Sequence, residues 1–141
     1  MYFFDSYALV EIVKGSKLYD TFKDVKPVCI ILNLFELHQV LLREFNKQTA
    51  DYWINKFDYI LLDISNEDIT EASDFRFKNK AKKLSMTDCI GYVVASKNSL
   101  KFLTGDKEFE GMKNVEFVKW PSSLNLPVNC FIYKLNSCLK R

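Results

Sequence analysis

Four acidic residues stand where apolar runs of the sequence give way to predicted helices. They are Asp5, Glu36, Asp88 and Asp106. Carboxylates supply both the oxygen ligands and the negative charge that hard cations such as Mg²⁺ and Mn²⁺ take in proteins. Such an ion lowers the pKa of an attacking water and neutralises charge on a phosphodiester. Brought together, these four acids would therefore suit metal-assisted hydrolysis of a phosphodiester bond.

Each acid also has a purely structural interpretation. Asn33-x-x-Glu36 and Ser85-x-x-Asp88 match the capping box, in which an acid satisfies free backbone amides at a helix start. Asp5 and Asp106 precede short helical segments and would serve as N-caps. Taken singly, motifs this short favour the structural role. A shared function depends on all four acids meeting at one place.

The elements that would position these acids follow from the apolar pattern. We expect strands at 2–4, 28–32, 59–64, 100–103 and 115–118. We expect helices at 6–14, at a short segment before Pro27, and at 34–45, 49–57, 66–83, 86–96 and 106–110. Alternating strands and helices predict a three-layer α/β fold with a central, mostly parallel sheet. The strand ends that feed helices then share one edge, where ligands bind.

Composition limits the other classes of protein. A chain of 141 residues with 48% apolar residues has enough core for one domain and is not disordered. Its longest apolar run, 28–32, is too short to span a membrane. The sequence begins Met-Tyr-Phe-Phe-Asp with no basic leader, so we expect a cytoplasmic protein without membrane contact. The four cysteines have no paired spacing and the only histidine is His38, which argues against a zinc site.

A basic stretch precedes Asp88. Five cations fall within the eight residues 76–83 with no acid among them, although the net charge of the whole chain is only +2. The cations are Arg76, Lys78, Lys80, Lys82 and Lys83. They would give sequence-independent affinity for phosphates. The alternative is a solvated helix face, and the sequence leaves the two interpretations even.

Four segments in this order resemble the PIN-domain ribonucleases, the family that includes VapC-type toxins of toxin–antitoxin pairs. The segments are Asp5-Ser6 after an apolar strand, the apolar helix start at Glu36-Leu37, Ser85-Met86-Thr87-Asp88, and Leu103-Thr104-Gly105-Asp106-x-x-Phe109. The resemblance covers residues 1–118 and implies a metal-dependent endoribonuclease that uses Mg²⁺ or Mn²⁺. By resemblance, the four acids would form the catalytic metal pocket, with Ser6 and Thr104 as supporting hydroxyls. It also implies an RNA substrate, a small antitoxin partner and a homodimer.

Two departures and several alternatives accompany the resemblance. Cys89 stands where the family often has alanine, and residues 119–141 extend past the last family strand. We expect this extension, with its apolar Phe131, Ile132 and Tyr133, to pack on the domain or on a partner. The alternatives are a housekeeping RNA-processing nuclease without antitoxin, a non-catalytic PIN-like interaction module, and a flavodoxin-like or receiver-like binding module. The sequence contains no Gly-rich phosphate loop, which argues against the flavodoxin-like or receiver-like module.

Overall fold

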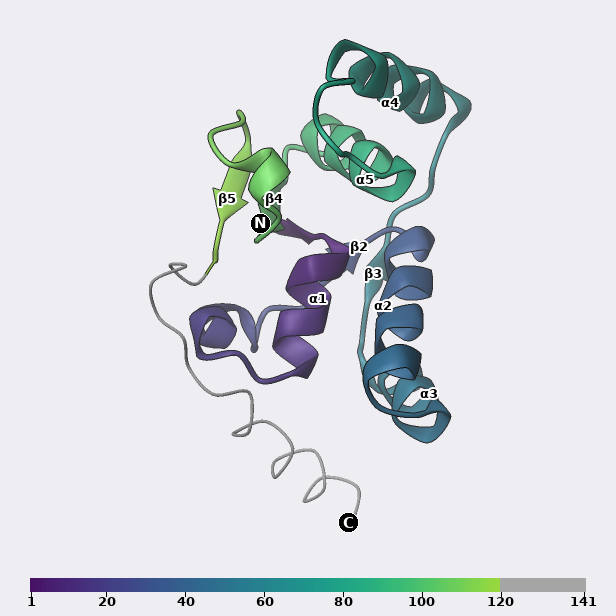
Figure 1. The fold of residues 1–141 in the computed structure, drawn as a ribbon, viewed down its shortest axis with the longest axis vertical. Coiled ribbons are helices and arrows are strands. Elements are labelled where there is room, and N and C mark those ends of the chain that lie inside the picture. Colours follow the sequence, from purple (N-terminus) through teal and green to yellow (C-terminus); the bar gives the residue numbers. More distant parts are fainter. Residues whose placement is uncertain (120–141) are drawn as a thin grey trace.

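Five short parallel strands form one sheet in the computed structural model, which describes residues 1–119. The strands are β1 (Tyr2–Phe4), β2 (Val28–Cys29), β3 (Ile60–Leu61), β4 (Lys101–Thr104) and β5 (Val115–Phe117). Their order is β3-β2-β1-β4-β5, so the first strand of the chain lies at the centre (Figure 1). All pairings are parallel, as the alternation of strands and helices predicts.

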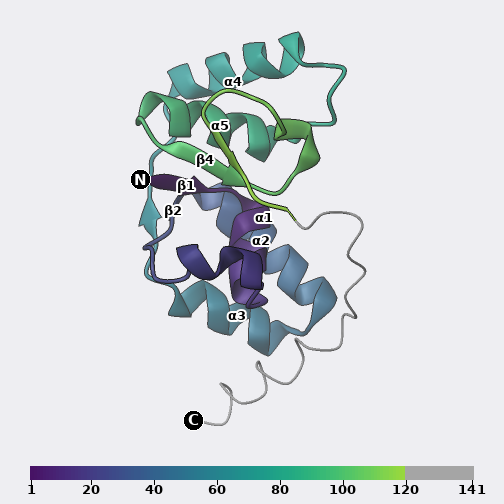
Figure 2. The same ribbon diagram turned by 90° about the vertical axis from the view of Figure 1, so that its left-hand side faces the viewer.

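Helices cover both faces of this sheet (Figures 1 and 2). The α-helices are α1 (Ser6–Val13), α2 (Ile31–Glu44), α3 (Lys47–Lys56), α4 (Asn66–Lys78) and α5 (Met86–Lys97), with 3-10 helices η1 (Lys17–Phe22) and η2 (Lys107–Phe109). One core contains buried residues of α4 and α5, and the other contains buried residues of α1, η1, α2 and α3. The predicted three-layer α/β class is confirmed.

Alternating side chains of the central strands separate the two cores. Phe3 of β1 and Phe102 of β4 face α5, and their rings stack with centroids 5.6 Å apart. The next residues along each strand, Phe4 and Leu103, face the opposite core. All four are fully buried. This period of two fixes the register of β1 against β4, which in turn places the residues after both strands at the same edge of the sheet.

Several predicted boundaries are wrong. Only Val28 and Cys29 of the apolar run 28–32 form a strand, and α2 begins at Ile31 rather than at residue 34. Asn33 is therefore not the N-cap: it occupies the third position of the helix, where its Oδ1 accepts the Ile30 amide at 3.0 Å. The helix expected at 66–83 ends at Lys78, where the Asn79 amide bonds the Phe75 carbonyl. Buried helices and buried strands are equally apolar, so a short run does not separate them.

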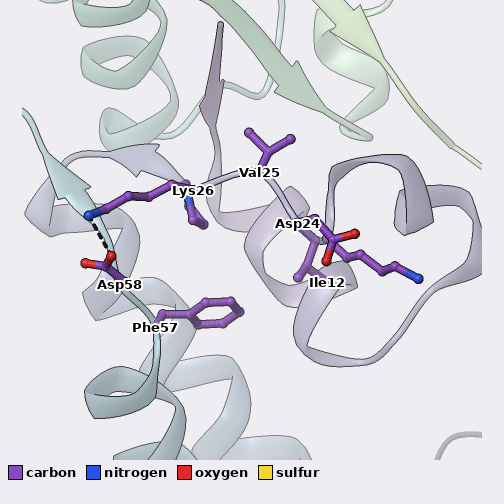
Figure 3. A pocket seen from close by; sticks show the side chains of 8 residues that line it. Ile12, Asp24, Val25, Lys26, Phe57 and Asp58 are labelled. Atoms are coloured by element: carbon purple, nitrogen blue, oxygen red, sulfur yellow. Dashed lines mark ion pairs between the residues drawn. The ribbon is translucent and has the colours of Figure 1, made fainter.

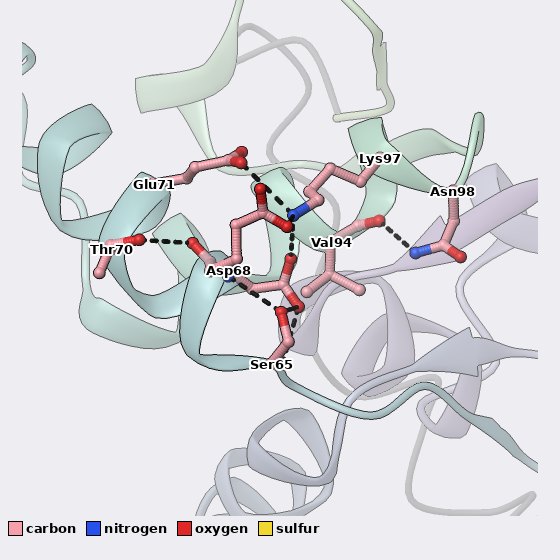
Figure 4. Close-up of polar contacts among 8 residues, drawn as sticks. Ser65, Asp68, Thr70, Glu71, Val94, Lys97 and Asn98 are labelled. Carbon is pink, nitrogen blue, oxygen red and sulfur yellow. Dashed lines mark hydrogen bonds and ion pairs between the residues drawn. The ribbon is translucent and has the colours of Figure 1, made fainter.

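An ionic cluster joins α4 to α5 (Figure 4). The ammonium of Lys97, near the end of α5, lies 2.9 Å from Glu67, 3.0 Å from Asp68 and 3.4 Å from Glu71. Asp68 also completes a capping box with Ser65 at the start of α4. These contacts stabilise the pairing of the two helices, and so hold α5 in place over the sheet.

Several other expectations have plain outcomes. Gly15 ends α1 with a φ of +70°, as its position after a lysine predicts. Cys29 and Cys89 are buried free thiols. Within residues 1–119, no helix is both long and apolar enough to cross a bilayer. The predicted extension at 119–141 lies, beyond Lys119, outside the described residues.

Candidate functional site: an acidic cavity at the carboxyl edge of the sheet

One cavity of about 570 Å³ opens at the carboxyl edge of the sheet, and all four predicted acids line it. Asp5 follows β1, Asp106 follows β4, and Glu36 lies in α2, which follows β2. Asp88 is positioned by a different kind of connection, because its helix α5 follows α4 rather than a strand. Four segments distant in sequence thus meet at one hollow, as the topology predicts.

Asp5 forms the buried end of the cavity, with only 2% of its surface exposed. As the N-cap of α1, it accepts the Ala8 amide on Oδ1 at 2.7 Å. Its Oδ2 accepts the hydroxyl of the wholly buried Thr104 at 2.5 Å. Burial is the main cause that raises the pKa of Asp5, to about 8, and the neighbouring Asp88 and Asp106 add to it. The two hydrogen bonds oppose that rise because they favour the carboxylate.

Glu36 is held by the other predicted hydroxyl. Ser6 donates to Oε2 of Glu36 at 2.5 Å, which links the first turn of α1 to α2. The amide of the buried Asn33 donates in turn to the Ser6 oxygen at 3.1 Å. The expected capping box between Asn33 and Glu36 is absent, because Glu36 lies in the second turn of α2. Its carboxylate is therefore not occupied in closing the helix end.

Asp88 does form the predicted capping box at the start of α5. Its Oδ2 accepts the Ser85 amide at 2.7 Å, and its own amide bonds the Ser85 hydroxyl at 3.0 Å. Burial raises the pKa of Asp88, with further contributions from the charges of Glu36 and Asp106, while the Ser85 bonds lower it. Asp88 is thus both a helix cap and part of the acidic cluster.

Asp106 caps η2, also as predicted, by accepting the Glu108 amide at 3.0 Å. Its own amide donates to the Thr104 hydroxyl oxygen at 2.9 Å. Gly105 between them has no room for a side chain: a Cβ would lie 2.3 Å from the Tyr7 ring and 2.6 Å from the Val118 carbonyl. The glycine of the Thr-Gly-Asp segment is therefore required by close packing.

The donor chemistry of this cluster fits a hard divalent cation. All four side chains offer carboxylate oxygens. Burial is the largest cause that raises the pKa of Asp5 and Asp88, and the charges of neighbouring acids add to it. Within residues 1–119, however, no three acidic, histidine or cysteine side chains are already arranged as a metal-ligand set. Binding an ion would require these side chains to close around it.

Cations also line the cavity, and the sequence did not single them out. They are Lys14 at the end of α1, Arg43 near the end of α2, and Lys119. Lys14 pairs with Glu44 at 2.5 Å, and the Lys119 ammonium lies 5.9 Å from the centre of the Tyr7 ring. The cavity thus joins acids to a set of lysine and arginine side chains. Single charges near helix ends carry no motif that would reveal this.

None of the five cations of the predicted basic stretch lines the cavity. Two of them form hydrogen bonds within the chain: Arg76 donates to the Leu84 carbonyl at 3.2 Å, and Lys82 bonds the Glu108 carbonyl. The Lys80 ammonium lies 5.7 Å from the centre of the Phe77 ring. Lys78, Lys80 and Lys83 are exposed. The stretch spans the last turn of α4 and the loop that leads to Ser85, which does line the cavity.

A second hollow of about 200 Å³ lies beside the Lys26–Asp58 ion pair, whose atoms are 2.7 Å apart (Figure 3). Ile12, Val25 and Phe57 form its apolar part. None of the predicted site residues lines it. The four predicted acids line the acidic cavity instead.

Comparison with solved structures agrees with this architecture. A structure titled as a toxin–antitoxin complex from Klebsiella pneumoniae matches with a TM-score of 0.65 and 17% identity, over 82% of this chain and 96% of the other. VapC20 of Mycobacterium tuberculosis, described as a sarcin–ricin loop cleaving toxin, matches with a TM-score of 0.68 and 14% identity, over 84% and 100% of the two chains. No family model and no curated protein matches the sequence. The resemblance to the VapC-type PIN ribonucleases predicted from sequence is thus confirmed at the level of the fold: the chain has a PIN-like fold.

Proposed function

We propose that this protein is a metal-dependent endoribonuclease and the toxin of a toxin–antitoxin pair. The observation that carries the proposal is the meeting of Asp5, Glu36, Asp88 and Asp106 at one cavity, on a fold shared with VapC20. Capping explains the places of three of these acids singly. It does not explain why four segments bring them to the same hollow, or why Glu36, which caps nothing, is held there by Ser6.

The four acids would hold Mg²⁺ or Mn²⁺, and Ser6 and Thr104 would keep two of them in position. The bound ion would supply a water of lowered pKa and neutralise charge at the phosphate. Thr104 and the Ala8 amide each engage one oxygen of Asp5, which fixes the plane of that carboxylate. The Ser6 hydroxyl donates to one oxygen of Glu36, and the Ser85 amide donates to one oxygen of Asp88. These bonds would limit the orientations of Asp5, Glu36 and Asp88 as the acids close around the ion.

RNA would reach the acids along positive side chains. Lys14, Arg43 and Lys119 line the cavity itself, and the basic stretch 76–83 lies in the segment that leads to it. Phosphates before and after the scissile bond need such counter-charges, because the acids repel them. The proposal therefore assigns the exposed cations of this stretch to contacts with the RNA backbone, outside the reacting centre; they are Arg76, Lys78, Lys80 and Lys83. Lys82 instead bonds the Glu108 carbonyl.

The test is RNA cleavage by the purified protein with Mg²⁺, with Mn²⁺ and with chelator. We expect cleavage with either ion, none with chelator, and a loss of at least about a hundredfold in Asp5→Asn and Asp88→Asn. Asp74→Asn is the matched control, because Asp74 is an exposed acid of α4 that does not line the cavity. Equal cleavage by all four proteins, or cleavage that survives the chelator, would contradict the proposal.

The partner proposals are separate. A neighbouring open reading frame should encode a small antitoxin that suppresses cleavage when co-purified, since one structural match is a toxin–antitoxin complex. We also propose a homodimer in the cytoplasm. Light scattering of the purified chain measures this, and a monomer across the accessible concentration range would refute it.

A further inference from the structure

Asn33 is a buried polar side chain beside the candidate site that the proposed function does not use. Only 1% of its surface is exposed, and it does not line the cavity. It lies in the first turn of α2, one turn before Glu36. A buried amide of this kind has to satisfy both its oxygen and its nitrogen, so its partners are informative.

The orientation of the Asn33 amide is fixed by the backbone. The Ile30 amide is left free by the start of α2, and Oδ1 of Asn33 accepts it at 3.0 Å. With the oxygen committed there, the amide nitrogen points to Ser6 and donates to its hydroxyl oxygen at 3.1 Å. Turning the amide over would place a donor against the Ile30 donor.

This bond decides where the Ser6 proton goes. A serine hydroxyl has one proton, and with Asn33 donating to its oxygen that proton is free to bond elsewhere. It is directed to Oε2 of Glu36 at 2.5 Å. The chain of bonds therefore runs from the Ile30 amide through Asn33 and Ser6 to one carboxylate oxygen of Glu36, and leaves the other oxygen of Glu36 outside it.

We propose that Asn33 is a positioning residue of the candidate active site, which acts through Ser6 to orient the Glu36 carboxylate. This inference rests on the proposed function for its catalytic consequence. Asn33 touches no group that would react, so its effect depends on the hydroxyl between it and Glu36.

Asn33→Asp separates this role from helix capping. An aspartate keeps the size of the side chain and still accepts the Ile30 amide, and its charge suits the start of a helix. It also offers Ser6 an acceptor in place of a donor, so the serine proton turns from Glu36 toward residue 33. Asn46→Asp is the matched control, because Asn46 caps α3 by accepting the Thr49 amide at 2.8 Å and lies outside the cavity.

We expect Asn33→Asp to lower kcat about tenfold with little change in KM, and to weaken binding of Mn²⁺ in calorimetry by a similar factor. Asn46→Asp should match the parental protein in both. In a Ser6→Ala background, Asn33→Asp should have no further effect, because the intermediary is gone. A full effect in that background would overturn the proposal and assign the loss to the added charge.

The outcomes also separate this inference from the proposed function. If the parental protein cleaves no RNA, yet Mn²⁺ binding still weakens through Ser6 in Asn33→Asp, the nuclease proposal fails and the positioning role stands. If the parental protein cleaves RNA and Asn33→Asp equals it in kcat and in Mn²⁺ affinity, the positioning role is wrong and the nuclease proposal stands.

Discussion

The Thr104 hydroxyl donates a hydrogen bond to Oδ2 of Asp5 across 99 residues of sequence. Parallel pairing of β1 with β4 makes the contact, because Phe4 lies opposite Leu103 and the next residue of each strand follows at the same edge. Thr104 also accepts the Asp106 amide. A single buried hydroxyl thus joins two of the four acids of the cavity.

Replacing this hydroxyl should affect both stability and activity. Thr104→Val keeps the shape of the side chain but leaves the Asp5 oxygen and the Asp106 amide without their partner. We expect a loss of about 1–3 kcal/mol in the free energy of unfolding and a strong decrease in RNA cleavage. Urea unfolding and a cleavage assay measure the two effects. Thr104→Ser, which keeps the hydroxyl, should restore most of both. A serine variant as impaired as the valine variant would show that the hydroxyl alone does not account for the effect.

Asp5 should make the metal-free protein less stable as the pH rises. Its pKa is about 8 in the folded chain against an ordinary 3.8, so between about pH 4 and pH 8 the folded state holds a proton that the unfolded state has lost. The free energy of unfolding then falls with rising pH over this window. Asp5→Asn should flatten this fall and raise the melting temperature near pH 8 by roughly 5 °C or more. Unfolding in chelator across the window tests this, and an unchanged slope in Asp5→Asn would refute it.

Asp88 combines capping with a place in the acidic cluster, and Asp88→Asn distinguishes the two. Asparagine still accepts the Ser85 amide, while the charge that Glu36 and Asp106 repel is gone. In chelator the variant should be as stable as the parental protein or more so. It should lose most of the stabilisation that Mg²⁺ or Mn²⁺ confers and nearly all RNA cleavage. Thermal unfolding with and without metal, beside a cleavage assay, measures all three. A variant that is less stable in chelator and cleaves RNA at the parental rate would leave Asp88 a cap alone.

The alternation of elements could be predicted from this sequence, and with it the edge where the acids meet. The start of α2 could not, because Ile30 and Ile31 are apolar like a strand and only the pairing of β2 shows that it ends at Cys29. The role of Asn33 could not be predicted for the same reason. An asparagine at this position could equally be a helix cap or a buried partner of Ser6, and the sequence does not distinguish the two. Lys14 and Lys119 were missed for another reason: the cavity brings them together through packing of α1 and the end of β5, which no local pattern encodes.

Gly105 should tolerate no side chain. A Cβ there would overlap the Tyr7 ring and the Val118 carbonyl, and the carbonyl belongs to the backbone and cannot rotate away. We expect Gly105→Ala to cost about 1–3 kcal/mol and to reduce cleavage by displacing Asp106. Gly15→Ala is the control: nothing lies within 4 Å of its Cβ, so only its φ of +70° opposes the change, at about 1 kcal/mol. Urea unfolding of both variants should rank Gly105→Ala as the more damaging, and the reverse order would contradict the packing argument.

The basic stretch should contribute to RNA binding through its exposed members. Replacing Lys78, Lys80 and Lys83 by Gln should weaken binding and reduce the slope of log K against log salt by about 0.7 for each lysine–phosphate pair removed from single-stranded RNA. Lys82→Gln should instead lower stability, because its ammonium bonds the Glu108 carbonyl. Filter binding at several salt concentrations measures the slope. A triple variant with the parental slope and full activity would show that the stretch is a solvated surface without a role in RNA binding.

The central place of β1 has a consequence for synthesis of the chain. Strand β1 pairs with β4 as well as with β2. It is the first strand to leave the ribosome, but it cannot complete its pairing until residues 101–104, which form β4, have been synthesised. Contacts this distant in sequence form late in folding. A nascent chain therefore carries Asp5 without Thr104 or Asp106 through most of its translation, and a truncated product that stops before β4 has no complete acidic cavity. The proposed nuclease activity would, by this order of assembly, require a chain translated at least as far as Asp106.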